Sequence, residues 1–450
     1  MLPPFTLPEP PPRLAPVVLA QADAPSTTPP APSSPPPATP ADRPLDVREP
    51  PFGDVDSSWM NGSNSQPSSL LTVGPLTLSL YVDTYYAWQF HQPVDHTIFP
   101  TTVGPRHDEI SLNLAHLGFD VTGLDGPIGR LYVQYGSIVE TIAGQDTTTT
   151  RGFFLTNRLL QNVEQAAAGW HFHALHGINA ELGIFPSYIG LESYLPEENW
   201  SYTHSFVADA TPYYFFGFRG QAFTSTRFKI ELWVVNGWQT FGQWHEGRAG
   251  GYLWNWRPVE WLSLVNSVYA GQEVRDDPDS LRLYSDNNVQ LRYYKGPEGR
   301  FLRSLALSLV SDVGWEHRSN APSGGIAGVS LAHRFEWTDR WKSAIRGDLL
   351  YDATQAISPK FPVGAAYPWM GTSPFFAGGI TGTLDFWPSP WIVTRLEYAH
   401  RTANQPIFSG AGGITGPGGE LPSSPAQGAT FTPDLRRFDD RILFNITLRL

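Results

Sequence analysis

Residues 439–450 read "DDRILFNITLRL", and apolar side chains occupy alternate positions along this stretch. A period of two is typical of a β-strand with one apolar face and one polar face. The apolar set is Ile442, Phe444, Ile446, Leu448 and Leu450, and the polar set is Arg441, Asn445, Thr447 and Arg449. A strand at a chain terminus frays unless a neighbour holds it. This strand therefore either closes a sheet or turns its apolar face toward something other than water.

Similar segments recur from about residue 75 to the end of the chain. Each is about ten residues long, the length that a tilted strand needs to cross a bilayer. The sequence predicts sixteen strands, at residues 75–88, 108–121, 128–136, 161–172, 177–186, 212–223, 227–236, 249–256, 261–270, 281–294, 300–315, 326–336, 341–351, 375–386, 391–400 and 439–450.

The connections between these segments alternate in length. Odd-numbered connections are long, whereas even-numbered ones are tight turns such as "STR" and "WPSP". A soluble sandwich has no reason to collect its long loops at one end, but an outer-membrane barrel does. We therefore predict an all-β fold over residues 71–450, a transmembrane antiparallel β-barrel. In such a barrel the last strand pairs with the first, and its apolar face meets lipid.

One predicted strand, 108–121, breaks the alternation. Ile110, Leu112 and Leu114 lie on one face, but Leu117 and the apolar residues after it lie on the other. A β-bulge near His116 would restore the pattern; the alternative is that this segment is not a regular strand.

The composition excludes several classes of protein. The chain has no cysteine, so it has neither disulfides nor cysteine metal ligands. A formal net charge of −12 without a basic block argues against a nucleic-acid partner. No stretch reaches the roughly 18 to 20 apolar residues of a membrane-spanning helix.

The start of the chain differs from the rest. Nineteen of the first 70 residues are proline, and a segment of this kind cannot bury a core. Residues 1–24 resemble a weak or truncated secretory signal, because a short apolar run precedes small-residue sites. We expect residues 25–70 to form a disordered Pro/Ala/Ser-rich tether in the periplasm.

Three of the predicted strands overlap the stretches "DEISLNLAHLGF" (108–119), "TPYYFFGFRG" (211–220) and "FKIELWVVNGWQ" (228–239). These stretches resemble motifs of the OmpL-like β-barrel porins of bacterial outer membranes. The resemblance spans about residues 76–450 in order, and it implies a passive outer-membrane channel without a known substrate. The sequence departs from the family at Ile184, where a lysine is common, and at Leu450, where many outer-membrane strands end on an aromatic residue. The matching positions are Gly183, Phe185, Gly190, Glu192, Asn199, Trp200, Tyr202, Ser205, Pro212, Tyr214, Gly217, Arg219 and residues 234–238.

Charged residues on the polar strand faces, together with one long loop, are the candidates for lining a pore. The loop at 187–210 is rich in acidic residues and is expected to fold inward against wall arginines as a constriction. The alternative is that these charges only solvate a wet interior and pair with one another. The candidates are Asp83, Glu192, Glu197, Glu198, Arg219, Lys229, Glu231, Arg292, Arg346, Asp348, Arg395 and Glu397.

Other polar clusters are weaker signals. His171, His173 and His176 fall at a predicted turn, and Asp276, Asp277 and Asp279 fall in a predicted external loop. Their spacing does not require a metal, and we predict neither metal nor cofactor. Because nucleophile-elbow and zinc-protease motifs are also missing, we predict that the chain is not an enzyme.

The sequence thus predicts a porin that lets small polar solutes or ions diffuse across the bacterial outer membrane. The rival hypothesis is an anchor or adhesin that acts through external loops with little conductance. A secreted carbohydrate-binding or hydrolytic β-protein suits the aromatic content but not the one-sided loops. The expected partners are outer-membrane lipid and lipopolysaccharide, and the barrel-assembly machinery through residues 439–450. Sixteen strands are also compatible with a homotrimer.

Overall fold

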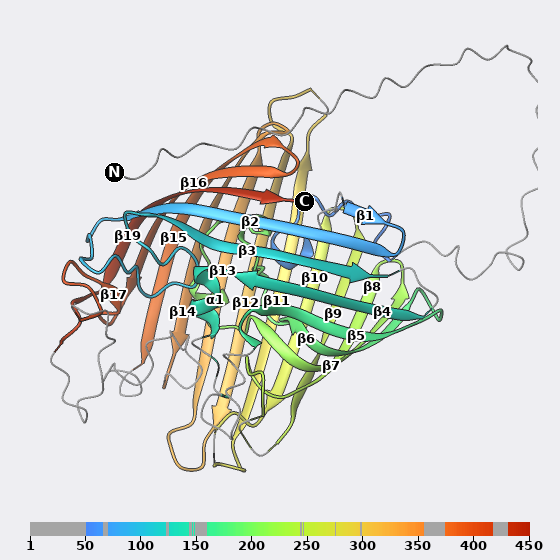
Figure 1. Cartoon of the computed structure of the whole chain (residues 1–450), viewed down its shortest axis with the longest axis horizontal. Coiled ribbons are helices and arrows are strands. Elements are labelled where there is room, and N and C mark those ends of the chain that lie inside the picture. Colours follow the sequence, from blue (N-terminus) through green and yellow to red (C-terminus); the bar gives the residue numbers. More distant parts are fainter. Residues whose placement is uncertain are drawn as a thin grey trace, which may run out of the picture. The chain divides into compact units, whose positions relative to one another are not determined.

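The computed structural model describes residues 51–65, 71–122, 126–143, 146, 148, 160–243, 245, 247–274, 276–297, 299–354, 374–416 and 431–450. Within these residues the chain forms a barrel of sixteen strands (Figure 1), which confirms the predicted architecture. The strands are β2 Leu76–Gln89, β3 Ile110–Val121, β4 Pro127–Tyr135, β5 Val163–Phe172, β6 Ile178–Pro186, β7 Tyr214–Ser225, β8 Phe228–Val235, β9 Ala249–Val259, β10 Leu262–Gly271, β11 Leu281–Lys295, β12 Ser304–His317, β13 Gly324–Glu336, β14 Trp341–Asp352, β15 Phe375–Ser389, β16 Ile392–Ala403 and β19 Phe438–Arg449.

Every strand of the barrel pairs antiparallel with its neighbours in sequence order, and β19 closes the ring against β2. The closing register runs from the Arg441–Gln89 pair to the Arg449–Tyr81 pair. Closure gives the backbone N–H and C=O groups of both terminal strands a partner, which hydrocarbon could not supply. The alternation in residues 439–450 thus belongs to the strand that seals the barrel.

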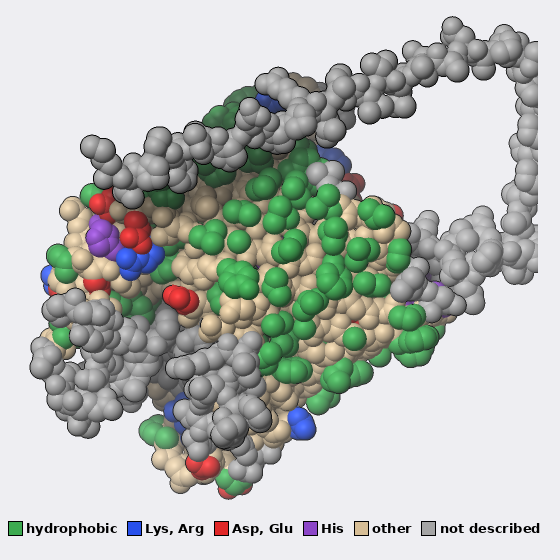
Figure 2. Space-filling view, in the orientation of Figure 1, with side chains coloured by type: hydrophobic (Ala, Val, Ile, Leu, Met, Phe, Trp, Pro, Cys, Tyr) green, Lys and Arg blue, Asp and Glu red, His purple; other side chains and the backbone are tan. Residues whose placement is uncertain are grey.

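The two faces of the wall have opposite chemistry. On β15 the Ile380 side chain is 63% exposed, whereas the adjacent Thr381 is 2% exposed and lies inside. Figure 2 shows apolar side chains spread over the outer face of the strands that it displays. Outward apolar residues and inward polar residues match a barrel that sits in lipid around a polar lumen.

The irregular strand β3 contains the expected bulge, a few residues before His116. Pairing with β2 shifts between Asp83–Leu114 and Thr84–Leu112, so Asn113 is the extra residue. Asn113 and Leu114 are consequently both buried, and the alternation changes phase at this point.

The connections separate into two ends of the barrel. The turn end carries the short links, such as 226–227 between β7 and β8 and 260–261 between β9 and β10. The loop end carries the long connections, which contain the short helices α1 (Ser137–Ala143) and α3 (Phe206–Asp209) and a small β17–β18 pair (Phe408–Ser409 with Leu435–Arg436). Among the described residues no helix has the length and apolarity to cross a membrane.

Residues 51–65, which we call the N-terminal segment, differ from the expected tether. Trp59 and Met60 are 1% and 2% exposed, and a single 3-10 turn (η3, Gly62–Asn64) follows them. The reason is chemical: unlike the proline-rich residues before it, this stretch offers a large aromatic side chain and several hydrogen-bonding groups to the barrel wall. The structure then adds a short strand, β1 (Leu71–Val73), which forms a hairpin with β2.

The outer face yields a first prediction. Leu331 on β13 is 51% exposed and pairs with Leu309 on β12, near the middle of both strands. Replacing Leu331 by arginine would place a charge in hydrocarbon and lower the free energy of unfolding by about 2–4 kcal/mol. Urea unfolding in lipid vesicles measures this loss, and Leu331→Ala is the control for lost bulk. Equal destabilisation by both variants would contradict the lipid-facing assignment.

Candidate functional site

A long loop crosses the interior of the barrel. Residues 187–213, which we call the inward loop, leave β6 and return to β7 at the loop end. Between these points the loop descends far enough for Glu198 to pair with Arg449, near the end of the chain. Trp200 and Phe206 on the loop are almost completely buried. The inward loop therefore occupies the lumen instead of extending away from the barrel.

Two short helical turns give the inward loop its local shape. A 3-10 turn (η5, Pro196–Glu198) begins with a proline, whose fixed φ suits the first position of such a turn. The helix α3 is capped by Ser205, whose hydroxyl accepts a hydrogen bond from the N–H of Ala208 at 3.1 Å. Between these turns the backbone is irregular, so its polar groups need partners from elsewhere.

Carboxylates of the barrel wall accept hydrogen bonds from that irregular backbone. Glu397 on β16 accepts from the N–H groups of Tyr202 (2.6 Å) and Thr203 (3.0 Å). Asp348 on β14 accepts from the N–H of Phe206 at 3.0 Å. A carboxylate is a stronger acceptor than a neutral oxygen, so these contacts fix the loop at two heights in the lumen.

Asp83 lies at the seam between the first and last barrel strands and is fully buried. It accepts hydrogen bonds from Tyr202 Oη (2.8 Å), Asn113 Nδ2 (2.8 Å), Thr447 Oγ1 (2.8 Å) and Asn445 Nδ2 (3.1 Å). One carboxylate thus joins the inward loop to β2, β3 and β19. The bulge in β3 is what turns the Asn113 amide toward it.

Arginines of the barrel wall donate hydrogen bonds to the backbone carbonyl groups of the inward loop. The guanidinium of Arg395 donates to the carbonyl oxygens of Pro196 (2.5 Å), Glu197 (3.2 Å) and Asn199 (2.7 Å). Its Nε donates to Asp385 at 2.9 Å, and the side chain is 1% exposed. The fixed fork of donors in arginine is suited to several acceptors at once.

Arg346 makes a similar contact on β14. It donates to the carbonyl oxygen of Thr203 at 2.5 Å, and it lies 3.4 Å from Glu192 of the inward loop and 3.6 Å from Asp348. Glu192 also accepts a hydrogen bond from the N–H of Ser205 at 2.9 Å. The predicted charges on the wall and on the loop therefore neutralise each other in pairs.

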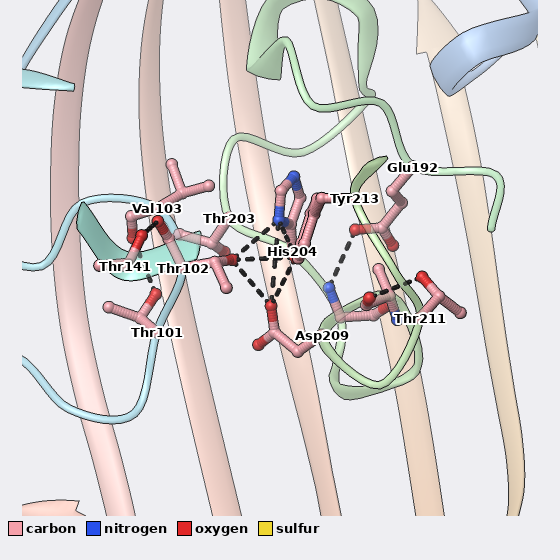
Figure 3. Close-up of polar contacts among 12 residues, drawn as sticks. Thr101, Thr102, Val103, Thr141, Glu192, Thr203, His204, Asp209, Thr211 and Tyr213 are labelled. Atoms are coloured by element: carbon pink, nitrogen blue, oxygen red, sulfur yellow. Dashed lines mark hydrogen bonds and ion pairs between the residues drawn. The ribbon is translucent and has the colours of Figure 1, made fainter. Parts of the chain in front are cut away.

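A compact polar cluster joins the inward loop to the connection after β2 (Figure 3). The Thr102 hydroxyl lies 2.8 Å from Asp209 Oδ1 and 2.9 Å from His204 Nδ1, and the Tyr213 hydroxyl lies 3.1 Å and 2.9 Å from the same two atoms. His204 Nε2 lies 3.1 Å from the carbonyl oxygen of Ser193. Two hydroxyl protons thus serve two acceptors, with His204 protonated on Nε2.

This cluster is arranged as a clamp between the inward loop and the connection after β2. Thr102, His204 and Asp209 resemble a nucleophile, a base and an orienting acid, but each is at most 3% exposed. Burial raises the pKa of Tyr213 well above its ordinary value, and Asp209 adds to the shift, so the hydroxyl keeps its proton as a donor. With every member paired inside the cluster, the geometry serves to fix the loop.

The lower part of the inward loop carries two adjacent carboxylates. Glu197 and Glu198 lie 3.0 Å and 2.7 Å from Nη1 of Arg449. Burial raises the pKa of Glu197; Arg449 opposes this rise, and Glu198 adds to it. The ionised form of Glu197 is therefore less favourable in the docked loop than in water.

Four of the predicted residues, Arg219, Lys229, Glu231 and Arg292, form ion pairs with groups outside the inward loop. Lys229 pairs with Glu231 on β8 at 2.8 Å, and Arg219 on β7 pairs with Glu181. Arg292 on β11 pairs with Asp56 of the N-terminal segment at 2.7 Å. These contacts neutralise the wall away from the loop.

A cavity of about 660 Å³ opens at the turn end. Its lining combines the N-terminal segment, the lower inward loop and the turns after β13 and β15. Cations and anions both face it. The charged lining residues are Asp56, Glu197, Glu198, Arg334, Asp339, Arg340, Lys342 and Arg449.

The twelve predicted residues divide by what they contact. Eight hold or belong to the inward loop: Asp83, Glu192, Glu197, Glu198, Arg346, Asp348, Arg395 and Glu397. The prediction omitted Arg401, which faces the same way as Arg395 and Glu397 on β16 and lies 3.4 Å from Asp209. Strand parity alone would have identified it. No sequence pattern of this kind indicated that Thr102 and the N-terminal segment contact the inward loop.

The weaker clusters have local partners. His171 Nδ1 lies 2.7 Å from Asn179 Oδ1 at the turn end, and Asp277 accepts hydrogen bonds from Ser319. Within the described part of the chain, no group of three or more histidine, aspartate or glutamate side chains is placed to hold a metal.

A closed sixteen-stranded barrel with an apolar outer face and a loop folded into a polar lumen defines an outer-membrane protein of the porin class. The chain belongs to the family described as "Putative beta-barrel porin-2, OmpL-like", whose model matches residues 75–425. The motif resemblance is thereby confirmed, and it locates the protein in the bacterial outer membrane. No curated protein matches the sequence.

Solved structures of outer-membrane proteins are similar to this chain at low sequence identity. An anion-selective porin from Comamonas acidovorans has a TM-score of 0.51 and 10% identity, covering 83% of this chain and 99% of that one. The outer membrane channel DcaP of Acinetobacter baumannii has a TM-score of 0.49 and 8% identity, covering 85% and 100%. OmpT of Vibrio cholerae has a TM-score of 0.47 and 8% identity, also covering 85% and 100%.

The arginine contacts predict how the inward loop is released. Arg395→Ala would leave Asp385 and three loop carbonyls without their donor, weakening loop docking by about 3–5 kcal/mol. We expect glutamyl endopeptidase to cut after Glu197 or Glu198 in this variant and not in the parent protein. Arg340→Ala, in an exposed turn, is the control. Equal resistance of all three proteins would contradict the role of Arg395.

The raised pKa of Glu197 gives a pH prediction with an unusual sign. A group whose pKa is higher in the docked loop binds its proton more tightly there, so its stabilising contribution is lost as pH rises. Docking should therefore strengthen when the pH falls from 8 toward the ordinary glutamate pKa of about 4.3. The strength of loop docking at each pH is measured by the hydrogen-exchange protection of residues 187–210, corrected for intrinsic exchange rates. The pH dependence should flatten in Glu197→Gln, and an unchanged slope would refute the assignment.

Proposed function

We propose that the protein is a passive, non-enzymatic diffusion channel for small polar solutes or ions, constricted by residues 187–210. The observation that carries this proposal is the inward loop, pinned across the lumen by buried wall charges. A loop fixed in this way narrows the lumen without filling it completely, because the cavity at the turn end remains open beside it.

Solute size is expected to matter more than charge. Wall arginines pair with all four acidic residues Glu192, Glu197, Glu198 and Asp209. Because these charges neutralise one another, we expect the electric field across the lumen to be weak. Four cations and four anions line the cavity at the turn end. A mixed lining of this kind favours small polar solutes with modest ion selectivity.

The orientation and partners follow from the same proposal. In outer-membrane barrels the short turns face the periplasm and the long loops face outward. Residues 1–50 would then lie in the periplasm. Lipid and lipopolysaccharide around the wall, assembly machinery at residues 439–450 and a homotrimer all stay predictions.

Planar-bilayer conductance of the refolded protein tests the proposal. We compare the parent with a variant in which residues 187–210 are shortened, and with Arg346→Ala/Arg395→Ala in case the shortened loop prevents folding. Stepwise current that increases in either variant is the expected result, because both widen the lumen.

The rival hypothesis of an anchor or adhesin predicts a different outcome from the same experiment. The inward loop and the N-terminal segment fill much of the lumen, and this observation favours low conductance. Stable insertion without current in the parent and in both loop variants would overturn the channel and support the anchor. Heat-modifiable migration on gels serves as the control for folding in each case.

A further inference from the structure

The N-terminal segment enters the barrel at the turn end. The N–H of Phe52 donates to the carbonyl oxygen of Thr226 in the β7–β8 turn at 2.7 Å. Trp59 Nε1 donates to the carbonyl oxygen of Glu260 in the β9–β10 turn at 3.1 Å. The chain returns to the same end, where β1 begins. The segment is therefore tethered at the turn end and reaches into the lumen from there.

Inside the lumen the segment contacts both the wall and the inward loop. The N–H of Asn61 donates to Gln290 Oε1 on β11 at 2.6 Å, and Asn61 Oδ1 accepts from the N–H of Trp200 at 2.7 Å. Trp200 Nε1 also donates to the carbonyl oxygen of Met60 at 3.2 Å. These contacts fill the space between β11 and the inward loop.

A glycine permits the closest approach to the inward loop. Gly62 has φ +62, and a Cβ at this position would lie 1.9 Å from the carbonyl oxygen of Leu191. The adjacent Ser63 N–H donates to that same oxygen at 3.0 Å. Any larger residue at position 62 would push the segment away from the loop.

The segment covers a buried cation for which the described residues provide no counter-ion. Arg257 on β9 is 1% exposed. In the described part of the chain its Nη2 donates to the carbonyl oxygen of Asn64 at 3.2 Å, and its guanidinium lies 4.5 Å from the Phe52 ring centre. Among the residues that the structure describes, its Nε and Nη1 have no hydrogen-bond partner, and the same holds for Asn64 Nδ2 and Ser65 Oγ. Burying a charge this way is costly, so docking of the segment works against the solvation of Arg257.

The ion pairs of the segment have the opposite effect on the wall. Asp54 and Asp56 neutralise Arg227 (2.8 Å) and Arg292 (2.7 Å). Removing the segment would take away two carboxylates and hydrate Arg257. Arg292 would keep its second partner, Glu260, and Arg227 lies in the exposed turn between β7 and β8. Arg257 would therefore be the arginine newly presented to the lumen.

We propose that residues 51–65 form a detachable plug, and that its departure opens an anion-favouring passage lined by Arg257. The proposal rests on the channel function above. It adds that Arg257 sets ion selectivity only after the segment has left. The firm contacts at Asn61 and Trp200 define the docked state, whereas the unsatisfied groups around Arg257 make that state reversible.

Deletion tests the plug directly. Removing residues 51–65 should raise single-channel conductance on the order of twofold and shift the reversal potential in a KCl gradient toward chloride. Deletion of residues 30–44, which removes the same number of residues from the proline-rich stretch, is the matched control. Arg257→Gln should abolish the chloride shift in the plug deletion and change little in the full chain. An equal effect of Arg257→Gln in both backgrounds would overturn the masking of Arg257.

A second pair of variants avoids deletion. Gly62→Ala should reproduce the increase in conductance, because its Cβ displaces the segment from Leu191. Gly74→Ala is the control, since Gly74 has a similar φ of +59 but nothing within 4 Å of a Cβ. Equal currents in these two variants would contradict docking through Gly62.

Thiol labelling separates failure of the plug from failure of the channel. The chain has no cysteine, so Asn255→Cys, under Asn64 on the β9 wall, introduces a unique thiol. A charged methanethiosulfonate should label it about tenfold faster after deletion of 51–65 than after deletion of 30–44. Faster labelling without current would overturn the channel and keep the plug. Equal labelling, with equal current, would overturn the plug and keep the channel.

Discussion

The requirement that every backbone polar group in hydrocarbon find a partner is the constraint on which the rest of the structure depends. It compels β19 to pair with β2, since either strand alone would expose a row of N–H and C=O groups to lipid. Asp83 reinforces this seam from the inside by binding Asn445 and Thr447 of β19 and Asn113 of β3. Closure in turn creates a lumen, and the polar face of every strand is directed into it.

A lumen lined by polar side chains must be filled by water or by other polar groups. In this protein the inward loop supplies many of them, and its irregular backbone is matched by charged side chains: carboxylates accept from its N–H groups and arginines donate to its carbonyls. The strong acceptors and donors of the wall thus act as a template for a segment without regular secondary structure. Charged side chains that face the lumen are thus used to hold the loop, and this use is the basis for proposing selection by size.

The sequence predicted the barrel well because its determinants are local: a period of two, strand length and alternation of loop length. The sequence signal for the β3 bulge, a change of phase in the alternation, was also local. The exact position of the bulge at Asn113 depends on pairing with β2. Strand parity placed Arg395 and Glu397 inside, although it could not show that both bind the loop. The N-terminal segment was missed because proline dominates the composition before it, and because its few buried apolar residues, among them Val55, Trp59 and Met60, form no strand pattern. Its partners in the wall and the inward loop lie at least 128 residues away in the chain, as with Ser63 and Leu191, and a local sequence pattern cannot indicate contacts over such a separation.

The two segments that fill the lumen differ in how well they fit it. The inward loop has its buried carboxylates paired and its cluster around Thr102 and His204 satisfied, so opening it would expose charges that now neutralise one another. The N-terminal segment meets the wall at Arg257 with donors left unpaired, and hydration of that guanidinium compensates for part of what its release costs. The inward loop and the N-terminal segment share one contact surface, at Trp200 and Met60. This contrast supports the proposal that the N-terminal segment, and not the loop, can leave the lumen.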